Sequence, residues 1–161
     1  MEDISEMGHG DPSYSRAFDI NNEEQIVGEI ARDDALNYGD TDRFAFIWEE
    51  GTFTYLAHLP GHSNSTAVAI NEVGQATGWS GDAADIDTTA VFWSNDQVSS
   101  IGVLDADINS RALAVNENGQ VVGTALKDTE RRAVLLTPLS RQRVLNMARR
   151  AAGPAVRARG E

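Results

Sequence analysis

Residues 67–78 read Ala67-Val-Ala-Ile-Asn-Glu-Val-Gly-Gln-Ala-Thr-Gly78, and two close variants of this stretch stand elsewhere in the chain. They read Ala17-Phe-Asp-Ile-Asn-Asn-Glu-Glu-Gln-Ile-Val-Gly28 and Ala112-Leu-Ala-Val-Asn-Glu-Asn-Gly-Gln-Val-Val-Gly123, so the copies start 50 and then 45 residues apart. Recurrence at this spacing is typical of proteins built from one supersecondary unit per repeat. The sequence therefore predicts one small multi-stranded sheet per repeat rather than a single conventional core.

Each copy predicts a β-hairpin. Val68 and Ile70 alternate along one face of a strand, and Asn71 then takes the first position of a type I turn whose fourth position is Gly74. Glycine at that position adopts positive φ easily and closes a bulged hairpin loop. The third copy keeps both turn residues, but the first copy has Glu24 in place of the glycine. A left-handed conformation at Glu24 is expected to cost ~1–2 kcal/mol.

A second pair of strands is expected after each hairpin. The third strands are apolar runs that read Phe44-Ala-Phe-Ile-Trp48, Thr89-Ala-Val-Phe-Trp93 and Arg132-Ala-Val-Leu-Leu136. Strands with two apolar faces need cover on both sides, as when small sheets stack face to face around an axis. Segments 54–61 and 99–105 supply fourth strands, so each full unit is predicted to contain four short strands.

The two ends of the repeat region complement each other. Asp3-Ile-Ser-Glu-Met-Gly8 matches the segment 55–61, whereas the third unit stops at Pro138 without a fourth strand. We therefore expect an all-β, propeller-like array of three four-stranded units over residues 1–138, with the last unit closed by the N-terminal strand. Three units are fewer than the ~4–8 blades of propellers. Unusually tight closure, a larger ring such as a head-to-tail homodimer, and a fragment of a longer protein all stay open.

These residues resemble the HAF-type extracellular repeat family over nearly all of residues 1–138. The family's serine is matched by Ser15, Ser65 and Ser110, its asparagine by Asn21, Asn71 and Asn116, and its glutamine by Gln25, Gln75 and Gln120. The resemblance implies a β-propeller-like array in bacterial, often secreted or surface-exposed proteins, with no defined activity for the repeat itself. The acidic segment 1–7 lacks the features of a signal peptide, and family members commonly carry more than three units.

Charge divides the chain into two parts. Residues 1–130 hold 24 acidic and five basic residues, whereas residues 131–161 hold eight basic residues and one acidic residue. An acidic body repels phosphate backbones, so we expect no nucleic-acid binding by the repeats. The sequence contains no cysteine and no apolar run of ~18 residues, so it predicts neither thiol chemistry nor a membrane span.

Residues 139–161 form a separate basic tail in the predicted organisation. A short basic helix that ends near Gly153-Pro154 is one interpretation, and a frayed or disordered terminus is the other, because such a helix without tertiary contacts is marginal in water. In the first case the tail would bind the acidic body or an anionic partner.

The sequence contains few candidates for catalytic or metal-binding residues. His9, His58 and His62 are the only histidines, no metal-binding motif accompanies them, and turn or packing roles are favoured for all three. Asp105-Ala-Asp-Ile-Asn109 begins like a calcium loop, but Ser110 replaces the required glycine and Asn116 the final glutamate. The acidic segments 39–42 and 81–87 are interpreted as solvated turns. We therefore predict no catalytic, cofactor or metal residues, and leave calcium binding by these loops open.

Two classes of function are compatible with this pattern. The favoured hypothesis is a non-enzymatic repeat module with a binding or structural role, whose loops on one rim contact a protein or glycan ligand. The alternative is a carbohydrate-active hydrolase or lyase that uses acidic loop residues, which need to lie ~5–9.5 Å apart. Because the aspartates are spread over the loops of every unit, the sequence favours binding.

Overall fold

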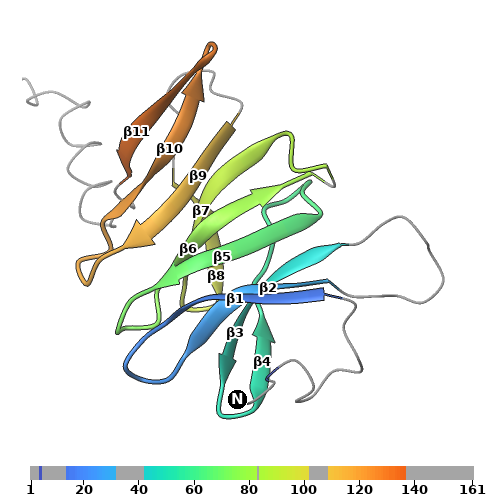
Figure 1. Ribbon diagram of the computed structural model, residues 1–161, viewed down its shortest axis with the longest axis vertical. Helices are drawn as coiled ribbons and strands as arrows, with labels where there is room; N and C mark the ends of the chain where they lie inside the picture. The colour runs from blue at the N-terminus through green and yellow to red at the C-terminus, as the bar shows by residue number, and fades with distance from the viewer. Residues whose placement is uncertain (1–3, 5–13, 32–41, 83, 102–108, 137–161) are drawn as a thin grey trace, which may run out of the picture.

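The computed structural model describes residues 4, 14–31, 42–82, 84–101 and 109–136, and within these the regular structure consists of antiparallel β-strands alone. Three sheets follow one another along the long axis of the molecule (Figure 1). The first sheet has the order β1-β2-β3-β4, with strands Tyr14–Ile20, Ile26–Ala31, Arg43–Glu49 and Thr52–Tyr55. The second has the order β5-β6-β7-β8, with strands Asn64–Ile70, Ala76–Gly81, Thr88–Ser94 and Gln97–Ser100.

The third sheet contains three strands in the described part of the chain. Its order is β11-β10-β9, with strands Asn109–Val115, Val121–Lys127 and Glu130–Leu136. The all-β class and the four-stranded units are thus confirmed for the first two repeats, but β4 and β8 begin before the predicted segments 54–61 and 99–105, and residues 56–59 are not part of a strand. Closure of the third unit by residues 3–7, and the basic tail 139–161, lie outside the described residues and stay predictions.

The hairpin turns have the predicted geometry. The Gly74 amide donates to the Asn71 carbonyl at 3.1 Å, and Gly74 has a φ of 73°. Gly119 at the same place in the third repeat has a φ of 69°. Glu24 takes the same left-handed conformation with a φ of 60°, which is the condition from which strain in the first repeat is expected.

Replacing Glu24 with glycine is expected to raise the free energy of unfolding by roughly 0–1.5 kcal/mol, because relief of the left-handed strain outweighs the entropy that glycine adds to the unfolded chain. The reverse change, Gly74→Glu, should lower it by at least ~1 kcal/mol. A Cβ at Gly74 comes no nearer than 3.4 Å to another atom, so this loss would report backbone strain rather than a clash. Urea denaturation measures the change in the free energy of unfolding for both variants. A neutral Gly74→Glu together with a harmful Glu24→Gly would contradict the turn assignment.

A β-bulge and a glycine recur together in each sheet. In β5 the bulge lies between Ala67 and Ala69, opposite Gly78 of β6. A Cβ at Gly78 would lie 1.9 Å from the carbonyl oxygen of Thr66. Gly28 and Gly123 meet equivalent backbone oxygens at 1.9 and 2.1 Å. The bulge therefore excludes every other side chain at this position, which explains why all three copies carry glycine there.

The first strand of each later sheet packs on the face of the sheet before it, and we call the face that receives it the forward face. Val27 and Ala45 on the forward face of the first sheet share a buried cluster with Ala67 and Ile70 of β5. In the second sheet, Ala90 and Phe92 share a cluster with Ala112 and Val115 of β9. Apolar burial of this kind contributes about 25 cal/mol per Å², so these two repeated interfaces hold the array together.

A serine hydroxyl adds one polar bond to each interface. Ser65 Oγ accepts the Ala45 amide of the preceding sheet at 2.9 Å, and Ser110 Oγ accepts the Ala90 amide at 2.9 Å. Both serines are buried. A buried N–H without a partner is costly, so the serine fixes the register between sheets.

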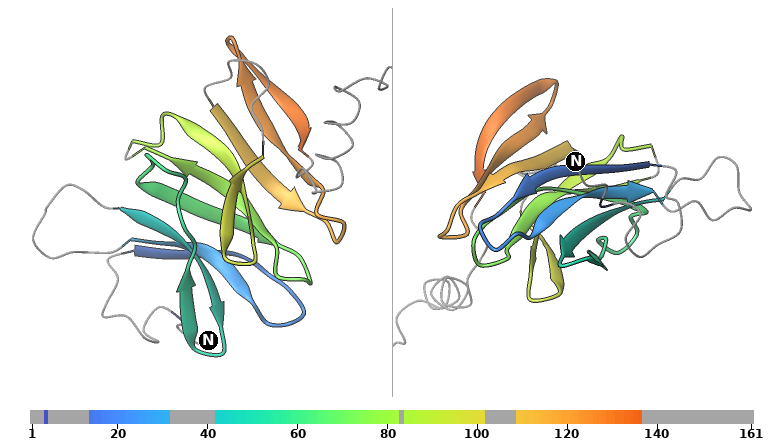
Figure 2. Two further views of the ribbon diagram at one scale, coloured as in Figure 1. Left: turned by 180° about the vertical axis from the view of Figure 1, so that it is seen from behind. Right: turned by 60° about the horizontal axis from the view of Figure 1, so that its bottom comes forward.

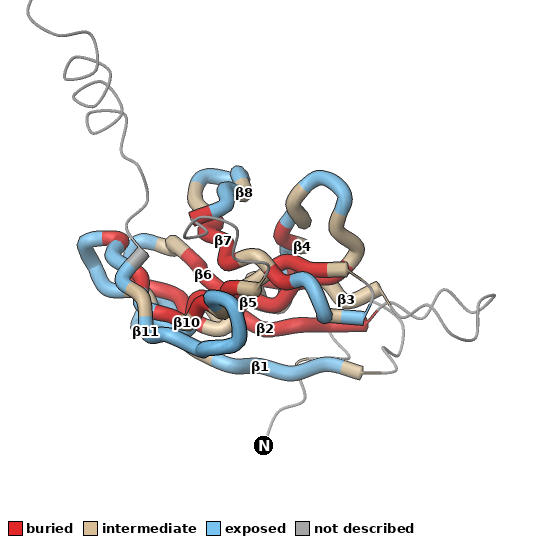
Figure 3. The backbone as a smooth tube through the Cα atoms, turned by 90° about the horizontal axis from the view of Figure 1, so that it is seen from above, coloured by how far each residue is buried: buried red, intermediate tan, exposed pale blue. Residues whose placement is uncertain are grey.

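Burial falls at the two ends of the array. Residues 90–93 of β7 are all buried, as the two-sided apolar pattern predicts. The equivalent strand β11 is largely exposed, because no further described sheet covers its forward face. The strand β1 is also exposed, whereas its counterpart β5 is buried (Figure 3). In the first sheet, Ile30, Phe46 and Phe53 form a cluster of their own.

Candidate functional site

Five hairpin turns lie at one end of the three sheets. The turns that follow β1, β5 and β9 lie on the left in Figure 1. The β3–β4 and β7–β8 turns lie at the same ends of their own sheets, since alternate turns of an antiparallel meander share an end. We call these turns, residues 21–25, 49–52, 71–75, 94–97 and 116–120, the acidic rim.

An asparagine holds each of the three main rim turns together. Asn71 Oδ1 accepts the amides of Val73 and Gln75 at 3.2 and 2.9 Å, and its Nδ2 donates to Gln75 Oε1 at 2.8 Å. Asn21 and Asn116 make the same set of bonds in their turns. These side chains replace the backbone groups that the turn leaves without partners.

The same asparagines also join the repeats. Asn21 Nδ2 donates to the Asn71 carbonyl at 3.0 Å, and Asn71 Nδ2 donates to the Asn116 carbonyl at 3.0 Å. The three turns are therefore tied in a row whose geometry repeats from sheet to sheet. The sequence showed the asparagines but gave no sign of this second bond.

Glutamates form a parallel row on the outer side of the turns. The Asn22 backbone and side chain both donate to the Glu72 carboxylate, and the Glu72 amide donates in turn to Glu117 at 3.2 Å. Sequence reasoning missed this row, although the polar residue after each asparagine was a signal for it. All three residues are exposed, so the row contributes to the surface as well as to the packing.

The surface of the rim is negative throughout. Its five turns contain no lysine, arginine or histidine, and the seven acidic residues are all exposed: Glu23, Glu24, Glu49, Glu50, Glu72, Asp96 and Glu117. Carboxylates concentrated on one surface attract cations and repel anions over a Debye length of ~8 Å. The rim is thus chemically suited to a basic partner.

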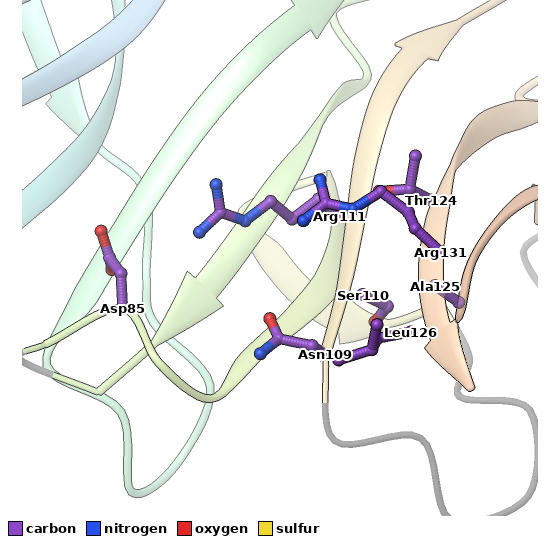
Figure 4. A pocket seen from close by; sticks show the side chains of 8 residues that line it. All are labelled: Asp85, Asn109, Ser110, Arg111, Thr124, Ala125, Leu126 and Arg131. Carbon is purple, nitrogen blue, oxygen red and sulfur yellow. The ribbon is translucent and has the colours of Figure 1, made fainter. Parts of the chain in front are cut away.

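A second feature lies at the opposite end, between the second and third sheets. A cavity of about 200 Å³ is lined by polar and apolar side chains from the β6–β7 loop, β9, β10 and the start of β11 (Figure 4): Asp85, Asn109, Ser110, Arg111, Thr124, Ala125, Leu126 and Arg131. Its volume suits a few waters or one small polar group.

Two of the three charged side chains that line this cavity, Arg111 and Asp85, have partners within the protein. The Arg111 guanidinium stacks over the Trp79 ring at 4.6 Å, and Asp85 forms an ion pair with Arg43. Asn109 bonds to Thr88 and to the Ile86 carbonyl. These contacts give the cavity a packing role between the two sheets.

The structure places two of the predicted histidines in packing and turn positions. His58 is half-buried, and its ring packs at a tilt against the Phe44 ring, with 4.6 Å between the ring centroids. His62 Nδ1 lies 3.0 Å from Ser80 Oγ, in the turn predicted for it. His9 lies outside the described residues. Within the part of the chain that the structure describes, no group of three potential metal ligands is present.

The acidic loop segments are only partly described. Asp82 Oδ1 accepts the Ile86 amide at 2.9 Å, and its carbonyl accepts the Asp85 amide at 3.0 Å, so a hydrogen-bonded turn is present, although Asp85 is half-buried and ion-paired with Arg43 rather than solvated. Residues 105–108 of the calcium-like segment, and residues 39–41, lie outside the described residues.

The titration of His58 should be visible in the pH dependence of stability. Burial lowers the pKa of His58, and a hydrogen bond with the Asn64 backbone opposes that shift only in part. The unfolded chain therefore takes up this proton at higher pH than the folded protein. The stability that neutral His58 provides is fully present above its ordinary pKa of about 6.5, and is lost as the pH falls toward the lowered value.

We expect urea denaturation of the wild type to show this loss between pH 7.5 and pH 5.5, and the variant His58→Gln to lose less stability over the same interval. Other groups titrate in both proteins, so the difference between the two slopes is the quantity to compare. If the free energy of unfolding changed with pH equally in both proteins, burial of His58 would not contribute to the pH dependence of stability.

Comparisons with models of protein families, with curated proteins and with solved structures returned no match. Among the described residues, no helix is long and apolar enough to cross a membrane.

Proposed function

We propose that the three sheets are consecutive units of a HAF-type, propeller-like array that acts as a non-enzymatic binding or structural module. The repetition of one interface between successive sheets supports this architecture. The same clusters, serine bond and asparagine bond occur between the first and second sheets and between the second and third. Exposed turns at one end of a repeat array are its usual contact surface, so the rim is the natural place for a partner to bind.

The contact surface in this proposal is the acidic rim, and the partner is a basic protein segment. The observation that carries it is that the five rim turns present seven exposed carboxylates and no basic residue. A neutral glycan would gain nothing from this charge, and aromatic platforms that stack on sugars are absent from the rim turns. In this proposal, which follows the resemblance to extracellular repeats, the binding occurs at the cell surface or in the medium.

A lysine-rich peptide is the direct probe of this proposal. The full-length protein should bind it in isothermal titration calorimetry, with an affinity that falls steeply as salt is raised. The double variant Glu23→Gln/Glu50→Gln, on the rim, should weaken binding. The matched control Asp128→Asn/Glu130→Gln removes two exposed acids at the β10–β11 turn, at the other end of the third sheet, and should leave binding nearly unchanged.

Equal effects of the two double variants would show that binding follows total charge rather than the rim. The alternative function, a carbohydrate-active hydrolase or lyase, is tested separately by incubating the protein with soluble polysaccharides. Release of new reducing ends would overturn the non-enzymatic proposal.

A further inference from the structure

The interface between successive sheets is formed by two surfaces. Each of these two surfaces also occurs once in the described chain without a partner surface packed on it. One half of the interface is the strand that begins a sheet, as β5 and β9 do. The other half is the forward face that receives this strand. The first sheet begins with β1, which no described sheet precedes, and the third sheet ends in a forward face that no described sheet follows (Figure 2).

The exposure of equivalent residues identifies the open half on β1. Ile20 of β1 is 58% exposed, whereas Ile70 at the same position of β5 is 6% exposed. Ala17 is also exposed, whereas Ala67 and Ala112 are fully buried. Ile20 and Ala17 thus lie in solvent on β1, although Ile70 and both equivalent alanines are core residues.

The third sheet shows the complementary pattern. Val122 is 49% exposed, although its counterparts Val27 and Thr77 are fully buried under the next sheet. Leu135 is 65% exposed, whereas its counterpart Phe92 is 6% exposed. Ala133, which corresponds to Ala45, is exposed as well. Exposed apolar residues that form a contiguous face mark interaction surfaces.

The polar bonds of the repeated interface are also open at both ends of the described array. Asn116 repeats the turn bonds of Asn71, but its Nδ2 has no carbonyl of a following turn to bind among the described residues. Ser15 corresponds to Ser65 and Ser110, which each accept an alanine amide from the preceding sheet. The amide in the matching position on the third sheet is that of Ala133.

We propose that the forward face of the third sheet binds strand β1 of a second copy of this chain, in the register that the chain uses twice internally. Asn116 Nδ2 then donates to the Asn21 carbonyl of the second copy, and the Ala133 amide donates to its Ser15 hydroxyl. Val122 and Leu135 cover its Ile20. The second copy is the occupant that fits, because each open half has its complement in the same sequence.

One position departs from the internal pattern. Tyr14 stands where β5 and β9 carry Asn64 and Asn109, and its hydroxyl donates to Glu29 within the first sheet at 2.8 Å. The side-chain bond that Asn64 makes to the Arg43 amide therefore has no equivalent at this contact. The contact between copies therefore contains the apolar packing and the serine and asparagine hydrogen bonds, but not the bond equivalent to Asn64–Arg43.

A contact of this kind is heterologous, so its geometry decides whether the assembly closes. Head-to-tail contacts give rings when the rotation closes and open chains when it does not. Two copies supply six sheets, which falls within the ~4–8 units of closed propellers. This proposal concerns the end faces and goes beyond the binding proposed for the rim, so its failure would leave the rim test unaffected.

Sedimentation velocity of the full-length protein over a wide range of concentration tests the association. We expect a species of twice the monomer mass, or a series of larger species if the contact does not close. Ile20→Arg on β1 and Leu135→Arg on β11 should each weaken association at least about tenfold, because a buried unpaired charge opposes the contact. The control Val73→Arg changes an equally exposed apolar residue on the rim and should associate like the wild type.

Mixing distinguishes this contact from a symmetric one. The Ile20→Arg variant keeps an intact third sheet, and the Leu135→Arg variant keeps an intact β1, so an equimolar mixture should form a dimer through one native contact. Circular dichroism should show both variants folded, since the two positions are exposed. A mixture that stays monomeric while the wild type dimerises would overturn the head-to-tail register.

The absence of cysteine from the sequence permits a direct test of the register. The double variant Ser15→Cys/Ala133→Cys should form disulfides between copies on oxidation, giving covalent dimers or a ladder on a non-reducing gel. The control Val73→Cys/Ala133→Cys should not. A monomeric wild type at every concentration, or a disulfide formed only within one chain, would contradict the proposal.

Discussion

Replacing Asn71 with alanine is expected to lower the free energy of unfolding by about 3 kcal/mol, because each buried polar group left without its partner costs ~1–3 kcal/mol. Asn71 is buried and holds its own turn through Val73 and Gln75. It also donates to the Asn116 carbonyl in the next repeat. The substitution therefore opens one turn and one interface between sheets at once. Urea denaturation followed by tryptophan fluorescence measures the change.

Asn116→Ala is the matched control for this prediction. Asn116 makes the same bonds within its turn, but it is exposed, and no described repeat follows it. Water replaces the lost bonds at an exposed turn, so the expected loss is about 1 kcal/mol. Equal losses for the two variants would mean that the bond between repeats contributes nothing measurable to stability.

Replacing Gly78 with alanine is expected to cost about 3 kcal/mol or more, which would be one of the largest effects of any single methyl group in this protein. The new Cβ would lie 1.9 Å from the Thr66 carbonyl oxygen, and the surrounding atoms are backbone. No side-chain rotation relieves this contact, so the β5–β6 pairing has to shift. Because β5 carries the interface with the first sheet, thermal unfolding should occur at a clearly lower temperature.

Gly81→Ala provides a matched control on the same strand. Its Cβ would approach the nearest atoms, the Asp87 carbonyl oxygen and a Thr88 methyl group, at 3.1 Å. Small movements relieve a contact of that kind, so the loss should be clearly smaller than for Gly78→Ala. If both variants were equally stable, the bulge at Ala67 would be soft enough to admit a side chain at Gly78.

The repeat and its local structure were open to prediction from the sequence. Asn71 and Gly74 specify their turn through bonds and a backbone conformation that depend only on neighbouring residues. The strain at Glu24 followed from aligning it with Gly74. The apolar runs in β3 and β7 predicted strands covered on both faces; β7 is largely buried, whereas most of β3 is half-buried.

The sequence predicted that loops on one rim form the contact surface, but it did not predict the hydrogen bonds between the rim turns. Loops at one edge of a repeat array are the usual contact surface, but the row that joins Asn22, Glu72 and Glu117 depends on how neighbouring turns align. The cavity beside Arg111 and Asp85 was not predicted, because its walls come from segments that are distant in the sequence.

The sequence by itself determined what depends on short-range chemistry: the number of repeats, the hairpins, the turn at Asn71 and the left-handed position of Glu24. Only the tertiary structure decided which of the equivalent residues are buried. Ile20 and Ile70 occupy equivalent positions in similar repeat sequences, yet one is exposed and the other lies in a core cluster. Burial depends on the presence of a neighbouring sheet, and local sequence carries no information about whether that neighbour exists.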